Sequence, residues 1–196
     1  MEDGELWTKA TAGDADAFGI LFDRHANAIY NYCFRRVGDW ALAEDLTSVV
    51  FLEAWRRRRT PIEQGKLLPW LFGVATNVIR NARRSLRRYE AALGRLPLPG
   101  PEPDFAPETA EELGLDQQLS EAMRLLALLP AREREIFVLC AWQGLSYQDA
   151  ALALGIPLGT VRSRLSRARE NLRELRASTG HIESRTAALP TSESIR

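Results

Sequence analysis

The chain has 196 residues and a mass of 22.0 kDa, with 45% apolar and 27% charged residues, and its 26 basic side chains are balanced by 26 acidic ones. This composition is typical of a folded globular protein and excludes fibrous chains. No apolar run approaches the ~18 residues of a membrane span, and the acidic amino terminus is unlike a secretory signal. We therefore expect a cytoplasmic protein without membrane insertion. The two cysteines, Cys33 and Cys140, form no CxxC pair, which argues against a zinc site.

The first half of the sequence predicts amphipathic helices. Apolar residues recur there at intervals of three and four, which is the period of one helix face. Asp39 is suited to cap a helix, Thr60-Pro61 is suited to end it, and Pro69 fits the first turn of the next one. The predicted helices cover about residues 18–36, 39–59 and 69–82. No β alternation appears, so the predicted fold class is all-α.

A proline-rich segment divides the chain. Residues 96–107 read LPLPGPEPDFAP and contain five prolines, so no regular helix can run through them. We expect two small helical domains, residues 1–95 and 116–177, joined by an extended linker at 96–115. The polar, aperiodic segment 178–196 is expected to be disordered.

The charges are segregated along the sequence although the total is neutral. Residues 80–95 hold six arginines and one acid, and residues 162–176 hold six arginines and two acids. Residues 101–121, between them, hold seven acids and no base. One such basic stretch is typical of a solvated helix face, whereas two of them indicate a polyanionic partner.

The carboxy-terminal half has the pattern of a helix-turn-helix. Ser146 and Asp149 have the spacing of a capping box, which predicts a helix start at Tyr147. Gly155 permits that helix to end, and Pro157 is suited to begin the second helix. This unit is the predicted DNA-binding part of the second domain.

The second helix of this unit has two distinct faces. Its apolar side, expected in the core, consists of Val161, Leu165, Ala168, Leu172 and Leu175. Its polar side carries Thr160, Arg162, Ser163, Ser166, Arg167 and Glu170. All of these but Glu170 are expected to contact DNA, with Thr160 at a phosphate. Arginine can donate two parallel hydrogen bonds to guanine, and serine permits close approach to base edges. A helical hairpin with a solvated arginine face remains the alternative.

These segments together resemble the extracytoplasmic-function (ECF) group of sigma-70 family initiation factors. The runs AEDLTSVVFLEAW and LPWLFGVATNVIRNARR resemble parts of the family's region two, and GTVRSRLSRAR resembles its region four. The resemblance implies a subunit of bacterial RNA polymerase that recognises the minus-ten and minus-thirty-five promoter elements and assists strand opening. The predicted partners are core RNA polymerase, through its β′ clamp helices and β flap, and promoter DNA. An anti-sigma factor is a common further partner in the family.

The resemblance also assigns individual residues. Asp45, Leu46 and Phe51 are the expected polymerase contacts, although Leu46 equally fits the domain core. The expected minus-ten contacts are Asn77, Arg80, Asn81 and Arg84. The polar face of the helix-turn-helix, from Thr160 to Arg167, is expected to bind the minus-thirty-five element. The linker reaches at most ~70 Å at ~3.3 Å per residue, enough to span the ~58 Å between two such elements.

We expect no catalytic residues, no cofactor and no metal. Neither His25 nor His181 has an evident partner in the sequence, and no phosphate-binding loop or nucleophile motif is present. Two alternatives remain open from the residues alone. One is a transcriptional regulator that binds duplex DNA without polymerase, and the other is a nucleic-acid enzyme such as a recombinase or nuclease.

Overall fold

The computed structural model describes residues 1–93 and 117–186, which form helices without any strand. The amino-terminal half consists of α1 (Asp3–Thr11), α2 (Ala15–Val37), α3 (Trp40–Arg56) and α4 (Leu67–Leu93). The carboxy-terminal half consists of α5 (Gln117–Leu128), α6 (Ala131–Phe137), the π-helical η1 (Val138–Trp142), α7 (Tyr147–Leu154) and α8 (Leu158–Thr186). The all-α prediction is confirmed.

Several predicted helix boundaries are confirmed by their capping contacts. The Asp39 carboxylate accepts a hydrogen bond from the Leu42 N–H at 2.8 Å, which starts α3. The Ser146 hydroxyl accepts a bond from the Asp149 N–H at 3.1 Å, which starts α7. Gly155 follows α7 with a φ of +62°, a left-handed conformation that favours glycine. These contacts establish the helix-turn-helix of α7 and α8.

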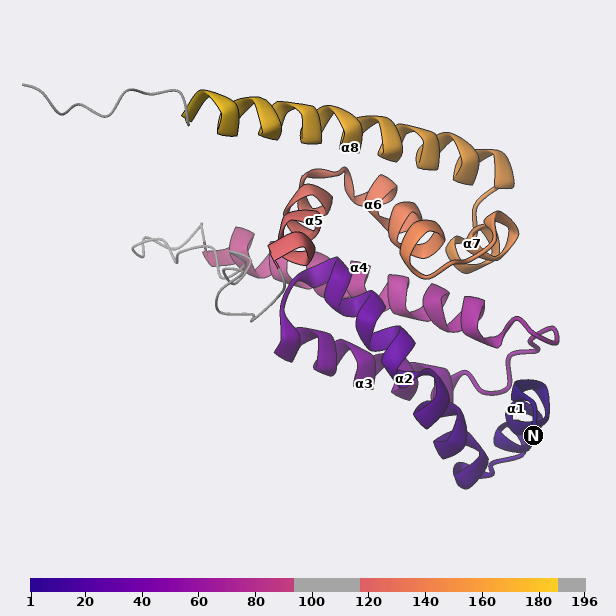
Figure 1. The fold of residues 1–196 in the computed structure, drawn as a ribbon. Coiled ribbons are helices and arrows are strands. Elements are labelled where there is room, and N and C mark those ends of the chain that lie inside the picture. Colours follow the sequence, from indigo (N-terminus) through magenta and orange to yellow (C-terminus); the bar gives the residue numbers. More distant parts are fainter. Residues whose placement is uncertain (94–116, 187–196) are drawn as a thin grey trace, which may run out of the picture.

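The two halves pack against each other in the described structure. Figure 1 shows α4 between the α2–α3 pair and the helices of the carboxy-terminal half. Helix α4 contacts α7, and α2 contacts η1. Buried apolar residues of both halves belong to one continuous cluster that includes Leu71, Ile79, Ile136 and Val161. The halves therefore form one body here, with the helix-turn-helix beside α4.

Three expectations need correction. Helix α1 was not predicted, yet it buries Leu6, Trp7 and Ala10 against the rest of the fold. Helix α8 begins at Leu158, one residue after Pro157, whose carbonyl accepts the first bonds of the helix. The expected disorder is wrong for residues 178–186, because α8 continues through them. The linker and the last ten residues lie outside the described residues.

Candidate nucleic-acid and polymerase interfaces

The outward face of α8 has the composition expected of a DNA-reading surface. Val161, Leu165 and Ala168 are at most 1% exposed, so they anchor α8 to the core as predicted. On the other side, Arg162, Ser163, Ser166 and Arg167 are exposed and Thr160 is half-buried. The structure thus brings the five predicted residues together on the first turns of α8.

A shallow recess beside this face contains residues that sequence reasoning missed. It has a volume of about 230 Å³ and is lined by Tyr147, Arg162, Leu165, Ser166, Arg169 and Arg173. Tyr147 is the first residue of α7, whereas the arginines lie along α8. The spacing of 162, 166, 169 and 173 is helical, and it is the signal that could have identified Arg169 and Arg173. Their guanidinium groups are suited to bind backbone phosphates next to the reading face.

The predicted minus-ten residues lie along one stripe of α4. Asn77, Asn81 and Arg84 are exposed, whereas Arg80 is only partly so. The amide groups of Asn77 and Asn81 can pair with base edges, and the two arginines can bind backbone phosphates. The stripe therefore has the chemistry expected for single-stranded DNA.

Arg80 is engaged by the carboxy-terminal half. Its guanidinium donates from Nε to Glu135 Oε1 at 3.0 Å and from Nη2 to Glu135 Oε2 at 2.6 Å. Arg36 Nη2 donates to the same carboxylate at 3.1 Å, and Glu135 is only 2% exposed. Burial raises the pKa of Glu135, but the hydrogen bonds and charges of Arg80 and Arg36 outweigh this and hold the pKa below its usual value.

Positive charge accumulates around this single carboxylate. Arg83 Nη2 donates to the backbone oxygen of Arg36, and Arg134 donates to backbone oxygens at the end of α5. Burial and neighbouring guanidinium groups lower the pKa of both Arg83 and Arg134. The cluster of Arg36, Arg80, Arg83 and Arg134 around Glu135 therefore carries an excess of positive charge at a largely buried place.

The loop between α3 and α4 also contacts the other half. The Lys66 ammonium lies 2.8 Å from Asp149 Oδ1 at the start of α7. Trp70, in the first turn of α4, packs edge-on against Trp7 with a centroid separation of 5.2 Å. Trp70 is therefore a packing residue, and the loop lies close to the helix-turn-helix.

The polymerase-contact prediction requires a correction on α3. Asp45 is exposed, but Leu46 and Phe51 are only 5% and 4% exposed and pack in the core. The exposed apolar side chains of this helix face are Val49 at 43% and Leu52 at 49%. Ser48, which precedes Val49, is also exposed. We call the exposed set Asp45, Ser48, Val49 and Leu52 the α3 face.

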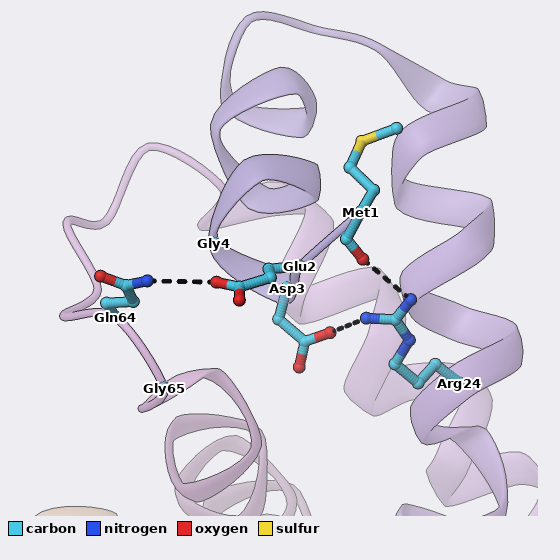
Figure 2. A pocket seen from close by; sticks show the side chains of 7 residues that line it. All are labelled: Met1, Glu2, Asp3, Gly4, Arg24, Gln64 and Gly65. Atoms are coloured by element: carbon cyan, nitrogen blue, oxygen red, sulfur yellow. Dashed lines mark hydrogen bonds and ion pairs between the residues drawn. The ribbon is translucent and has the colours of Figure 1, made fainter.

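A second recess, near the start of the chain, already has its polar groups paired (Figure 2). Arg24 bonds the Asp3 carboxylate and the Met1 carbonyl, and Gln64 donates to Glu2 at 3.2 Å. His25 Nε2 lies 2.8 Å from Asp3 Oδ2, so the expectation that His25 lacks a partner is wrong. These contacts attach α1 to α2 and to the α3–α4 loop.

No described group of three histidine, cysteine or acidic side chains is placed to hold a metal ion. Within residues 1–93 and 117–186, no helix has both the length and the apolarity needed to cross a bilayer.

Two family models match the chain in the order that its two halves suggest. Residues 21–89 match sigma-70 region 2, and residues 119–172 match sigma-70 region 4. The first range contains α3 and the α4 stripe, and the second contains the helix-turn-helix. The matched segments thus define a protein with the two promoter-recognition regions of a sigma factor.

Comparison with curated relatives agrees with the family models. The chain is 37% identical over 175 residues to the ECF RNA polymerase sigma factor BldN of Streptomyces coelicolor, covering 87% of this chain and 64% of BldN. It is 34% identical over 163 residues to the RNA polymerase sigma factor CarQ of Myxococcus xanthus, covering 83% of this chain and 91% of CarQ. The chain belongs to the ECF group of the sigma-70 family. The family consists of transcription initiation factors and not of enzymes.

A solved structure has the same fold. The sigma factor RpoE, in complex with the anti-sigma factor NepR from Bartonella quintana, aligns with a TM-score of 0.66 and 25% identity. The alignment covers 82% of this chain and 96% of RpoE.

Proposed function

We propose that this chain binds core RNA polymerase in the bacterial cytoplasm and directs it to promoters with defined minus-ten and minus-thirty-five elements. The observation that carries this proposal is the presence of both sigma regions in order, each with an exposed polar helix face where DNA would bind. The family membership supports the same role. The chain contributes recognition and strand opening, and the polymerase performs the chemistry.

The proposed division of labour follows the exposed faces. The α3 face docks on the β′ clamp helices, since its apolar side chains are exposed beside the carboxylate of Asp45. The α4 stripe of Asn77, Arg80, Asn81 and Arg84 binds the separated strands of the minus-ten element. The carboxy-terminal half contacts the β flap and places α8 in the major groove of the minus-thirty-five element.

Within α8, the residues have different tasks. In this proposal the exposed side chains of Arg162, Ser163, Ser166 and Arg167 contact base edges, and Thr160 at the helix start contacts a phosphate. Arg167 Nε donates to the Ser163 carbonyl at 3.4 Å in the free protein, a weak bond that DNA can replace. Arg169, Arg173 and Tyr147, from the recess, fix the register through the backbone.

An anti-sigma factor is a further proposed partner. RpoE, which has the same fold over most of its length, is bound by the anti-sigma factor NepR in its solved structure. Co-purification of this chain with a small protein that blocks its binding to polymerase would support the proposal.

Run-off transcription with purified core enzyme tests the proposed function. The chain is expected to select defined start sites, and Arg167→Ala is expected to cost ~1–3 kcal/mol and relax preference at one upstream position. Arg176→Ala is the matched control, because it removes an exposed arginine of α8 outside the reading face. Promoter binding by the chain alone, unchanged by polymerase, would instead favour an autonomous regulator.

Asn77→Ala tests the minus-ten assignment separately. This variant is expected to keep upstream binding but to form fewer open complexes, because one contact to the separated strand is lost. Permanganate footprinting of unpaired thymines measures strand opening directly. Normal opening by the variant would contradict the assignment of Asn77.

A further inference from the structure

The loop between α3 and α4, residues 57–66, has two backbone carbonyls that accept hydrogen bonds from α1. The Thr11 hydroxyl donates to the Arg58 carbonyl at 2.8 Å, and Trp7 Nε1 donates to the Thr60 carbonyl at 3.3 Å. Figure 1 shows α1 at the end of the molecule where α4 begins. Helix α1 therefore holds the main chain of the loop and does so through two of its own side chains.

The loop is exposed and only partly fixed by its own hydrogen bonds. The Thr60 N–H donates to the Arg57 carbonyl at 2.8 Å, and the Lys66 N–H donates to the Glu63 carbonyl at 3.0 Å, so each end of the loop forms a turn. Residues 63–65 are exposed to solvent. A segment with so few buried groups opens easily unless neighbouring elements hold it. The bonds from α1 are therefore expected to determine which conformation the loop adopts.

Helix α1 is itself fixed to α2, so it can act as a support for the loop. A helix of nine residues is only marginally stable on its own. Here the Asp3 carboxylate bonds Arg24, as Figure 2 shows, and lies 2.8 Å from His25 Nε2, with both partners on α2. The side chains of Leu6 and Ala10 are fully buried. The support thus runs from α2 through α1 to the loop.

The loop connects the two surfaces that the proposed function assigns to polymerase and to the minus-ten element. It follows α3 and leads directly into α4. Its last residue, Lys66, contacts Asp149, and Arg80 of the α4 stripe contacts Glu135. Both acids belong to the carboxy-terminal half, so Lys66 and Arg80 lie on the same side of the amino-terminal half. A separated strand that follows the stripe toward the start of α4 therefore reaches the loop, where the Lys66 ammonium can bind a phosphate.

We propose that Trp7 and Thr11 are positioning residues, which hold the α3–α4 loop in the conformation that binds the separated strand of the minus-ten element. Both side chains act through the main chain of the loop, and neither contacts DNA. The proposal rests on the proposed function, since it concerns how the same surface is organised. Without these two bonds the loop adopts other conformations, so the fraction of chains able to bind the strand falls. Polymerase binding uses the α3 face and is expected to be unchanged.

Substitutions of Thr11 test the support without altering any charge. Thr11→Val removes the hydrogen bond to the loop, whereas Thr11→Ser keeps the hydroxyl group. Thr8→Val is the matched control, because the Thr8 hydroxyl donates within α1 to the Gly4 carbonyl at 2.8 Å, just as Thr11 also donates to the Trp7 carbonyl at 2.9 Å. Hydrogen exchange of the full chain, followed by mass spectrometry, measures the opening of the loop. Exchange over residues 57–66 is expected to be several-fold faster in Thr11→Val, and unchanged in Thr11→Ser and Thr8→Val.

Trp7→Phe is an independent test, because it removes the indole N–H and keeps an aromatic ring in the core. It is expected to increase exchange in the loop as Thr11→Val does. With core enzyme on a duplex promoter, both variants are expected to form several-fold fewer open complexes, as measured by permanganate footprinting. Thr11→Ser and Thr8→Val are expected to open the promoter normally. All four variants are expected to bind core enzyme with the affinity of the wild type.

The outcomes separate the two proposals. If folded Thr11→Val or Trp7→Phe exchanges the loop amides at the wild-type rate, the supporting role of that residue is refuted. If the loop exchanges faster but open complexes form normally, or if Thr11→Ser fails to restore them, the positioning role is refuted. If no form of the chain directs transcription, the proposed function fails, and hydrogen exchange still decides whether α1 supports the loop. Circular dichroism confirms that each variant is folded.

Discussion

Leu52→Ala and Leu46→Ala distinguish a docking surface from a core on the same helix. The two side chains lie six residues apart on α3, with 49% of Leu52 exposed and only 5% of Leu46. Full burial of a leucine side chain is worth ~1.5–3 kcal/mol, and about half of Leu52 remains available to a partner. Docking is therefore expected to gain ~1 kcal/mol from Leu52, so Leu52→Ala weakens polymerase binding ~5-fold.

The order of the two variants is expected to be the opposite for stability, with Leu46→Ala lowering the free energy of unfolding more than Leu52→Ala. Leu46→Ala creates a cavity in the core and is expected to lower the free energy of unfolding by ~2–5 kcal/mol. Leu52→Ala removes a side chain that is already half exposed, so its effect is expected to be smaller, ~1 kcal/mol. Urea denaturation followed by tryptophan fluorescence measures both, since Trp7 and Trp70 pack inside the fold.

Polymerase affinity is measured by titrating a fluorescently labelled chain with core enzyme, at temperatures where each variant is folded. A folded Leu46→Ala protein is expected to bind like the wild type. The assignment of the α3 face is refuted if Leu52→Ala binds normally. It is equally refuted if folded Leu46→Ala loses affinity, because a buried side chain would then be part of the contact.

Three further predictions concern buried groups. Tyr32 OH lies 2.8 Å from the Thr76 hydroxyl, which itself donates to the Phe72 carbonyl. Tyr32→Phe is expected to lower the free energy of unfolding by ~1 kcal/mol, as measured by urea denaturation. Thr76→Val is expected to lower it further, because the buried Tyr32 hydroxyl then has no hydrogen-bond partner. Burial raises the pKa of the Cys33 thiol to about 12, so iodoacetamide is expected to modify Cys33 at pH 8 only after unfolding, as followed by mass spectrometry. The pKa of Glu135 is below its usual value, so its contribution to the free energy of unfolding is complete above pH ~4.3 and is lost as the pH falls through that lower pKa. The loss of stability in acid, measured by urea denaturation, is expected to be smaller in Glu135→Gln.

The helix-turn-helix could be predicted from the sequence because its signals are local. Ser146, Gly155 and Pro157 act on backbone groups within a few residues, and the structure contains the expected cap and the left-handed turn. Helix α1 had a comparable signal, since Glu2 and Glu5 form a capping box. It was missed because α1 is short and only three of its side chains are buried.

The polymerase face could not be selected from the pattern of α3. This helix carries apolar residues around most of its circumference, so periodicity alone does not show which of them face the core. Helices α2 and α4 pack against α3 and bury Leu46, Val50 and Phe51, and this packing determines which residues of α3 face the core. Val49 and Leu52 remain exposed for the same reason.

The contact between the halves could not be predicted from the sequence, although one residue, Gly73, is an indication of it. Glu135 and Arg36 are 99 residues apart, and no local rule pairs them. Gly73, however, lies inside an otherwise apolar helical stripe, where a glycine often marks a close approach of another backbone. The segment 80–95 was interpreted correctly as basic, but its surroundings depend on which helix packs beside it.

The contact between the halves joins one buried carboxylate, that of Glu135, to two arginines of the amino-terminal half. One buried carboxylate faces four arginines, and the lowered pKa values of Arg83 and Arg134 reflect the cost of burying positive charge beside like charge. Apolar packing and the close approach of Gly73 to Ala153 stabilise the contact between the halves, whereas the excess positive charge destabilises it.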